Sequence, residues 1–357
     1  MKNELLEKIK KNTNIKDASV LSASKFFTKK DMIQTNIPAL NIALSGRIDG
    51  GFVPGLTLWC GQSKSFKSLF SLIMAKAYMD KYPESILIFY DCEFGTPDSY
   101  FEMLKIDRER VLHIPIMNME EFKFDVIKQL ENLERGDKVV FIVDSIGNMS
   151  SKKEMEDAID GKSVQDMSRA KQMKSIFRMI TPYLNRLDIP MIAVNHIYME
   201  QGAMYAKPIV SGGQGVYLSS DTIFIMGRQQ EKEGTEIAGW NFIINVEKSR
   251  YVQEKSKIPV TVKYEGGLSK WSGLLDMALE GKFVVKPSNG WYSRVIASTG
   301  EIEEKKWRIK DTDCAEFWMP ILTSTHFREW IKNTYQVANG QLISDEQIDL
   351  DLADDVK

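Results

Sequence analysis

The chain of 357 residues contains only three cysteines and three histidines, the residues that form disulfides or bind structural metals in small folds. Cys60, Cys92 and Cys314 are too few and too widely spaced for a disulfide framework or a zinc site. They favour a reducing compartment. His113 and His326 have no acidic or cysteine partner at ligand spacing, so we interpret them as structural residues.

Long apolar runs and an excess of one charge are absent too. No uncharged run reaches the roughly 18 residues of a membrane span, and the first residues lack a signal-peptide core. We therefore expect a cytoplasmic protein without a membrane partner. Lys+Arg 47 against Asp+Glu 49 leaves a net charge of -2, so any nucleic-acid site must be local. With 43% hydrophobic residues the chain should fold, as two domains or one large domain with an appendage.

The middle of the chain, residues 36–270, alternates short apolar runs with longer periodic stretches. This pattern is typical of a mostly parallel central sheet with helices on both faces. Helices are predicted at about 67–81 and 166–187. The last strands follow each other closely, which indicates an antiparallel end of the sheet. The expected strands are 56–60, 86–91, 139–144, 190–195, 222–227, 241–247 and 258–264.

Both ends of the chain differ from this middle part. Residues 1–35 start with a charged helical pattern and contain the pair Phe26-Phe27, which needs a pocket in this subunit or the next one. In residues 271–340 the sequence becomes richer in aromatic residues and mixes helix and strand patterns, which predicts a small α/β lobe. Residues 341–357 carry six acids and little apolar content, so we expect a solvated acidic tail.

The strongest local signal is 61-GQSKSFKS-68, which follows a strand and opens a helix. In a phosphate-binding loop, backbone amides face the phosphates, Lys67 neutralises them and the Ser68 hydroxyl binds Mg2+. The usual pattern has Gly where this chain has Phe66, so the ring must turn away from a nucleotide. A plain Ser/Lys-rich turn is the alternative. The expected nucleotide-binding residues are Gly61, Ser63, Lys64, Ser65, Phe66, Lys67, Ser68 and Leu69.

Two buried-type strands end in acids. The run 139-VVFIVDS-145 ends in Asp144, where a nucleotide hydrolase holds a water of the Mg2+ shell. Ordinary turn chemistry is the alternative there. The run 86-ILIFYDCEFG-95 ends with Asp91 and Glu93, and a glutamate beside a γ-phosphate could polarise the attacking water. A solvated loop acid is the alternative for Glu93.

Taken in order, these segments and 190-PMIAVNHIYM-199 resemble the core of the RecA-type recombinases. The segment 36–68 resembles the entry of that ATPase core, and 273–294 resembles the carboxyl-terminal lobe of bacterial RecA. Phe66, with 24-SKFFTKKD-31 and 246-VEKSRYVQEKSK-257, is similar to one branch of the family, the UvsX recombinases of T-even bacteriophages. The resemblance covers nearly all of residues 1–340. It implies an amino-terminal polymerisation segment, a RecA-like core and a carboxyl-terminal lobe.

The resemblance also assigns roles around the nucleotide. Glu93 positions the attacking water, and Asp144 supports Mg2+ through a water. Tyr100 matches the tyrosine that stacks on adenine, and Tyr264 matches a second adenine neighbour more weakly. His196 stands where many members have Gln, at the strand end that reports the γ-phosphate state, although imidazole titrates near neutral pH. The plain alternative for His196 is a polar strand cap.

A pair of cations and two loops complete the assignment. Lys248 and Arg250 match basic residues that reach the γ-phosphate of a neighbouring subunit, with a solvated strand end as the alternative. Residues 152–166 and 199–213 match the two DNA-binding loops, and we expect the first to be mobile without a ligand. Single-strand binding needs phosphate neutralisation and apolar contact with bases. The residues assigned to DNA are Arg169, Tyr205, Lys207, Ser211, Gly212 and Gly213.

The resemblance implies an ATP-dependent DNA recombinase that forms helical filaments on single-stranded DNA and catalyses pairing and strand exchange with a homologous duplex. The resemblance implies ATP and Mg2+ as cofactors. Its implied partners are both DNA forms, copies of itself, a phage single-strand-binding protein and a recombination mediator, in the cytoplasm of an infected host. The alternatives are a hexameric helicase with the same core and a nucleotide-switched assembly module without strand exchange. The carboxyl-terminal lobe and the Phe pair stand against the helicase.

Overall fold

The computed structural model describes residues 4–28, 30–162, 168–200, 202, 206–233, 236–263, 267–296 and 298–337. The chain divides into two compact units. Unit 1 comprises Met1–Ile33, Val53–Leu58 and Ser68–Ser220, and unit 2 comprises Gln34–Phe52, Trp59–Lys67 and Asp221–Lys357. Each unit is thus assembled from separate stretches of the sequence.

Unit 1 is built on parallel strands. Their order is β1-β5-β4-β2-β3, with parallel pairing of β2 to β3, β2 to β4 and β4 to β5. Strands β4 and β5 are buried along their whole length, which explains their unbroken apolar sequence. The predicted parallel sheet is therefore confirmed. The strands are β1 (Gly55–Gly61), β2 (Ile86–Asp91), β3 (Val111–Pro115), β4 (Val139–Asp144) and β5 (Pro190–Asn195).

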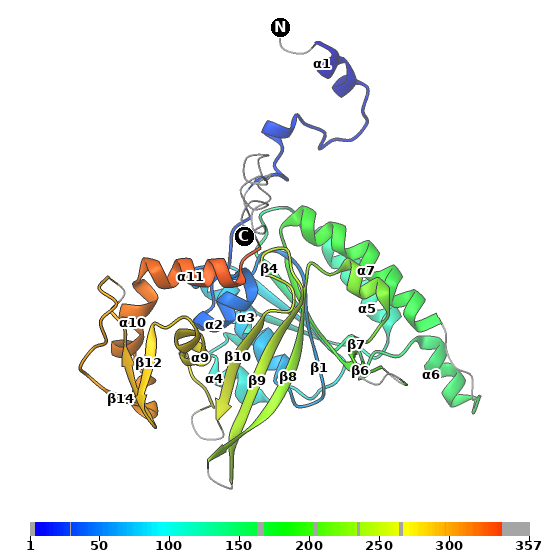
Figure 1. Cartoon of the computed structure of the whole chain (residues 1–357). Helices are drawn as coiled ribbons and strands as arrows, with labels where there is room; N and C mark the ends of the chain where they lie inside the picture. Colours follow the sequence, from blue (N-terminus) through cyan, green and yellow to red (C-terminus); the bar gives the residue numbers. More distant parts are fainter. Residues whose placement is uncertain are drawn as a thin grey trace. The chain divides into compact units, whose positions relative to one another are not determined.

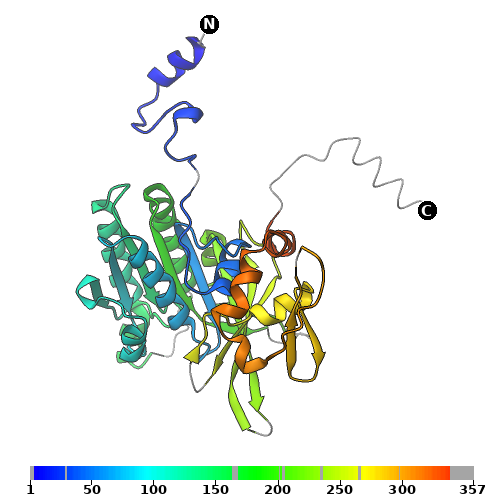
Figure 2. The same ribbon diagram turned by 90° about the vertical axis from the view of Figure 1, so that its left-hand side faces the viewer.

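Helices accompany these strands, and α5 and α7 lie side by side (Figures 1 and 2). The helices expected at 67–81 and 166–187 are present as α3 and α7. A small antiparallel pair, β6 (Ile197–Met199) and β7 (Pro208–Val210), follows β5. The helices are α1 (Glu4–Lys11), α3 (Lys67–Lys81), α4 (Asp98–Met103), α5 (Met119–Asn132), α6 (Lys152–Ile159), α7 (Ser168–Leu187) and α8 (Gln214–Ser219), with single turns η1 (Leu21–Ala23) and η2 (Arg108–Arg110).

Unit 2 contains the antiparallel strands. Their order is β8-β9-β10-β11, and every pairing within this set is antiparallel, as the close spacing of the strands predicted. Strands β8 and β9 are longer than the predicted 222–227 and 241–247. Helix α2 (Pro38–Ser45) is buried at all eight positions. The strands are β8 (Thr222–Glu233), β9 (Glu236–Lys248), β10 (Lys257–Lys263) and β11 (Gly267–Leu268).

The end of unit 2 forms the small α/β lobe that was predicted. Strands β12, β13 and β14 make an antiparallel sheet of their own. Phe327 packs between Phe283 and Trp330, with ring centroids 4.9 and 6.1 Å away. The elements are α9 (Leu274–Glu280), β12 (Val284–Ser288), β13 (Trp291–Arg294), β14 (Trp307–Arg308), η3 (Ile309–Thr312), α10 (Ala315–Thr323) and α11 (Thr325–Tyr335).

The two adjacent phenylalanines of the amino-terminal segment lie in different environments. Phe26 lies under the guanidinium of Arg135, 5.4 Å from the ring centroid, whereas Phe27 is 76% exposed. Asp17 pairs with Lys25 and Arg186, so part of the segment is held on unit 1 of the same chain. The three apolar side chains of α1 are exposed to solvent on this chain. Within the residues that the structure describes, no helix is long and apolar enough to cross a membrane.

Candidate functional site

The phosphate-type loop connects the end of β1 to the start of α3. Lys67 is only 6% exposed, and its Nζ donates to the carbonyl of Gln62 at 2.8 Å and to Ser65 Oγ at 3.4 Å. Ser65 Oγ in turn donates to the same carbonyl at 2.7 Å. A Cβ at Gly61 would lie 2.8 Å from Ser65 Oγ, so the loop needs glycine there. The ammonium group is therefore held inside the loop by neutral oxygens that a phosphate could replace.

Phe66 shows why the usual pattern has glycine before the lysine. Its φ is +58°, in the left-handed region that costs a residue with a side chain about 1–2 kcal/mol. The ring packs edge to face on Phe242 of β9, with centroids 5.2 Å apart, and such a pair contributes about 0.5–1.5 kcal/mol. This contact offsets much of the backbone cost. Ser63 and Lys64 are exposed in the same loop, and Leu69 is buried beyond it.

Ser68 and Asp144 meet in unit 1. Ser68 Oγ donates to Asp144 Oδ2 at 2.6 Å, and Thr96 Oγ1 donates to the same oxygen at 3.0 Å. Asp144 is 4% exposed, and burial raises its pKa although both hydroxyls oppose the rise. A hydroxyl beside a buried carboxylate fits the oxygen ligands and bound water that Mg2+ takes. In the part of the chain that the structure describes, no three His, Cys, Asp or Glu side chains cluster as metal ligands.

The raised pKa of Asp144 leads to a stability prediction. Because the folded state disfavours the ionised carboxyl, Asp144 stabilises the fold at low pH and this contribution is lost as pH rises through its folded-state pKa. Asp144→Asn should therefore raise the free energy of unfolding at pH 7 by on the order of 1 kcal/mol. Denaturant unfolding without nucleotide or Mg2+ checks this, with a pH series. The gain should shrink toward pH 4, and an equal gain at every pH would contradict the prediction.

Glu93 receives several donors on one oxygen. Its Oε1 accepts from Ser145 Oγ and from Asn148 Nδ2 at 2.9 Å, and His196 Nε2 lies 3.0 Å away. The backbone N–H of Glu93 donates to Asp91 Oδ1 at 3.1 Å, which fixes the turn after β2. The structure thus brings Glu93 and His196 together. No motif or spacing in the sequence pointed to Asn148.

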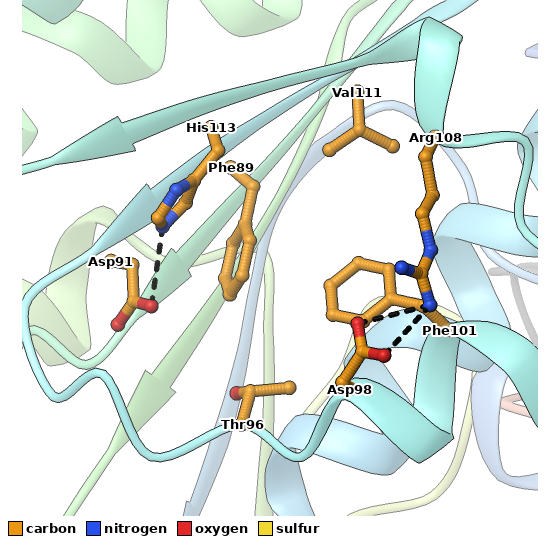
Figure 3. A pocket seen from close by; sticks show the side chains of 8 residues that line it. All are labelled: Phe89, Asp91, Thr96, Asp98, Phe101, Arg108, Val111 and His113. Carbon is orange, nitrogen blue, oxygen red and sulfur yellow. Dashed lines mark hydrogen bonds and ion pairs between the residues drawn. The ribbon is translucent and has the colours of Figure 1, made fainter.

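A pocket of about 300 Å³ lies beside the same turn (Figure 3). His113 Nε2 is 3.3 Å from Asp91 Oδ2, and Arg108 pairs with Asp98 at 2.9 Å. His113, interpreted as a structural residue, thus contacts an acid that caps the Glu93 turn. Tyr100 is half-buried on α4, and burial raises its pKa. The pocket is lined by Phe89, Asp91, Thr96, Asp98, Phe101, Arg108, Val111 and His113.

The two cations lie at the end of β9 in unit 2. Lys248 is partly buried, and burial lowers its pKa. The Arg250 side chain is 73% exposed and pairs with Asp221 at 3.0 Å. Its guanidinium is therefore open to solvent on most sides, where a second molecule could reach it.

The first DNA-loop segment is partly helical, over residues 152–159. These residues form α6, because Ser151 and Glu154 make a reciprocal capping box at its start. Arg169, at the beginning of α7, donates to the backbone carbonyls of Gly147 and Met149, the latter at 3.0 Å. Residues 163–166 lie outside the described part of the chain.

The second segment contains β7 and ends directly before α8. Lys207 is exposed. The backbone N–H of Ser211 donates to the carbonyl of His196 at 3.0 Å, which ties this segment to the strand end beside Glu93. Gly212 and Gly213 have φ of +89° and +76°, conformations that favour glycine. Tyr205, Tyr264 and the acidic tail at 341–357 lie outside the described residues.

Comparison with known proteins gives consistent matches over most of the chain. The model of the RecA N-terminal domain matches residues 3–269, and that of the bacteriophage T4 recombination and repair protein, C-terminal domain, matches residues 271–331. The recombination and repair protein of Enterobacteria phage T4 is 48% identical over 353 residues, 98% of this chain and 90% of that protein. Protein RecA of Desulfotalea psychrophila is 27% identical over 79% of this chain and 77% of its own. Protein RecA of Chlorobium limicola is 26% identical over 70% and 69%.

Proposed function

Since the chain belongs to the RecA family, we propose that it is an ATP-dependent recombinase that forms filaments on single-stranded DNA and exchanges strands with a homologous duplex. The observation that carries this proposal is the arrangement in unit 1, where Ser68 bonds Asp144 and Glu93 lies against His196. A hydroxyl and a carboxylate for Mg2+ together with a positioned acid are the parts that phosphoryl transfer to water requires. The 48% identical phage relative is named a recombination and repair protein, which supports the same role.

Each residue of the site then has a chemical task. Lys67 would leave the Gln62 carbonyl to bind the β and γ phosphates of ATP, while Ser68 and Asp144 hold Mg2+, the latter through water. Mg2+ bound with the nucleotide neutralises charge that develops on the phosphate oxygens. Glu93 would accept a hydrogen bond from the attacking water and orient it in line. His196, held against Glu93, would lose or gain this contact with the state of the γ-phosphate.

Assembly and DNA binding involve other surfaces. We assign filament contacts to the amino-terminal segment, because Phe27 and the apolar side chains of α1 are exposed on this chain. DNA would contact the segments after α6 and after β6, where Lys207 supplies charge and Gly212 and Gly213 allow close backbone approach. A phage single-strand-binding protein and a recombination mediator fit this role as partners in the cytoplasm of an infected host.

Lys248 and Arg250 would complete the active site of a neighbouring subunit, and this can be tested by mixing variants. A Lys248→Ala subunit keeps Glu93, and a Glu93→Gln subunit keeps the cations, so about a quarter of the interfaces in a random equimolar mixture would be intact. The ATPase rate of the mixture should exceed the sum of the two separate rates. Strictly additive rates in mixtures shown to co-assemble would contradict action between subunits.

Strand exchange itself tests the proposed function. The protein is incubated with ATP, Mg2+, circular single-stranded DNA and a linear duplex of the same sequence, and joint molecules are resolved on a gel. A duplex of unrelated sequence is the control. We expect joint molecules with the homologous duplex alone. ATP hydrolysis without joint molecules from the homologous duplex would favour the assembly-module alternative, and unwinding of both duplexes would favour the helicase.

A further inference from the structure

We propose that Asn148 is a positioning residue for the catalytic carboxylate of Glu93, and that Arg169 supports it by holding the turn on which it stands. This inference rests on the proposed function, because it assigns Glu93 to water activation. It links the start of α7, directly after the first DNA-loop segment, to the reacting centre by side chain and backbone contacts within unit 1.

The contact between Asn148 and Glu93 is direct. Asn148 Nδ2 donates to Glu93 Oε1 at 2.9 Å, on the same oxygen that accepts from Ser145 and faces His196. A hydrogen bond to an ionised group is stronger than a neutral one, so a donor at this point restrains the carboxylate orientation. Asn148 is exposed, so its side chain contributes little to the core of the fold. Its contact with Glu93 is therefore the main interaction that a substitution would remove.

The turn carrying Asn148 is held from the other side by Arg169. The guanidinium donates to the carbonyls of Gly147 and Met149, the two neighbours of Asn148 in the sequence. A planar guanidinium can donate to two acceptors at once, whereas an ammonium group acts as a point charge without this fork. Arg169 thus fixes the backbone on both sides of Asn148, and the side chain can reach Glu93 in one orientation.

The turn also touches the sensor histidine. A Cβ at Gly147 would lie 2.6 Å from His196 Cδ2 and 2.9 Å from Asn195 Oδ1, closer than real contacts allow. The backbone of the turn therefore packs directly on the strand end that holds His196. Movement of Arg169 would change the position of Asn148 and also the packing of Gly147 against His196. Both Asn148 and His196 contact Glu93. DNA phosphates that attract Arg169 would in this way alter the rate of hydrolysis.

The order of two variants at position 148 tests the positioning role. Asn148→Ala removes the donor, and we expect the kcat for ATP hydrolysis on single-stranded DNA to fall about 5- to 10-fold. Asn148→Asp keeps the shape of the side chain but brings a second carboxylate against Glu93, so its kcat should fall further than that of the Ala variant. The KM for ATP should stay within about twofold in both, because Asn148 acts on Glu93 and not on the nucleotide.

A role of Asn148 in the turn alone predicts the opposite order, since Asp preserves shape and local hydrogen bonding better than Ala. Equal rates for wild type and both variants, or a milder loss in Asn148→Asp, would overturn the inference. If Glu93→Gln hydrolyses ATP at the wild-type rate, the proposed function fails instead. The two failures are therefore distinguishable by including Glu93→Gln in the same series.

Arg169→Lys tests the second link. Lysine keeps the positive charge that a DNA phosphate needs but lacks the planar fork for two carbonyls. We expect this variant to bind single-stranded DNA within about threefold of wild type while its DNA-stimulated kcat falls about 5-fold or more, and Lys171→Arg on the same helix serves as the control. Retained kcat together with weakened DNA binding would assign Arg169 to DNA contact alone and overturn its supporting role.

Discussion

Glu93→Gln should bind ATP and assemble on single-stranded DNA like wild type, while hydrolysis falls by roughly 100-fold or more, the scale of losing a general base. Glutamine keeps the shape of the side chain, and its amide oxygen can accept from Asn148 and His196 as the carboxylate does. It cannot take a proton from water. The loss should therefore fall on kcat, with the KM for ATP changed little.

The measurement pairs steady-state ATPase rates with binding of a fluorescent ATP analogue. Glu102→Gln is a matched control, because Glu102 lies nine residues further along on α4 and has a largely exposed side chain. We expect this control to hydrolyse ATP at the wild-type rate. Loss of nucleotide binding in Glu93→Gln would instead show that the carboxylate maintains the fold around Ser145 and His196.

Lys67→Ala should abolish nucleotide-dependent assembly and hydrolysis together. The ammonium is buried in the loop against Gln62 and Ser65, and its removal leaves the phosphate charge unneutralised. Losing one charge-stabilising donor in a site of this kind costs about 10²- to 10³-fold in rate. We also expect ATP affinity to fall, because the same group contributes to binding.

Lys128→Ala is the control for this variant. Lys128 carries the same charge but is exposed on α5, and it has no assigned role in nucleotide binding. Titration with a fluorescent ATP analogue and light scattering on addition of single-stranded DNA measure the two functions. Wild-type hydrolysis by Lys67→Ala would contradict the assignment of 61–68 as the phosphate loop, whereas equal losses in both lysine variants would indicate a nonspecific charge effect.

The buried parts of the fold were the easiest to predict. Strands β2, β4 and β5 have the bounds expected from their apolar runs, because a strand covered on both faces needs apolar residues throughout. Strand β3 was missed, since it is an edge strand whose side chains are half-exposed and whose sequence includes His113 and Pro115. Helix α5 was missed although it buries four side chains along one face. Helix α6 was missed because its start depends on the Ser151 cap and not on apolar periodicity.

The same contrast holds for the candidate site. Lys67, Ser68, Asp144 and Glu93 stand at strand ends and loop positions that a phosphate site requires, so their sequence context was enough to propose them. Asn148 did not stand out, because its role depends on a turn that returns to Glu93 across 55 residues of sequence. Contacts of this kind are set by the packing of strand ends and cannot be read from local patterns.

We propose that this chain polymerises on single-stranded DNA as an open helix of ATP-bound subunits. Electron microscopy of the wild-type protein with single-stranded DNA, Mg2+ and a nonhydrolysable ATP analogue tests it most directly, with nucleotide-free protein as the comparison. We predict helical filaments that lengthen with the DNA and depend on the nucleotide. Closed rings of fixed subunit number under the same conditions would contradict it.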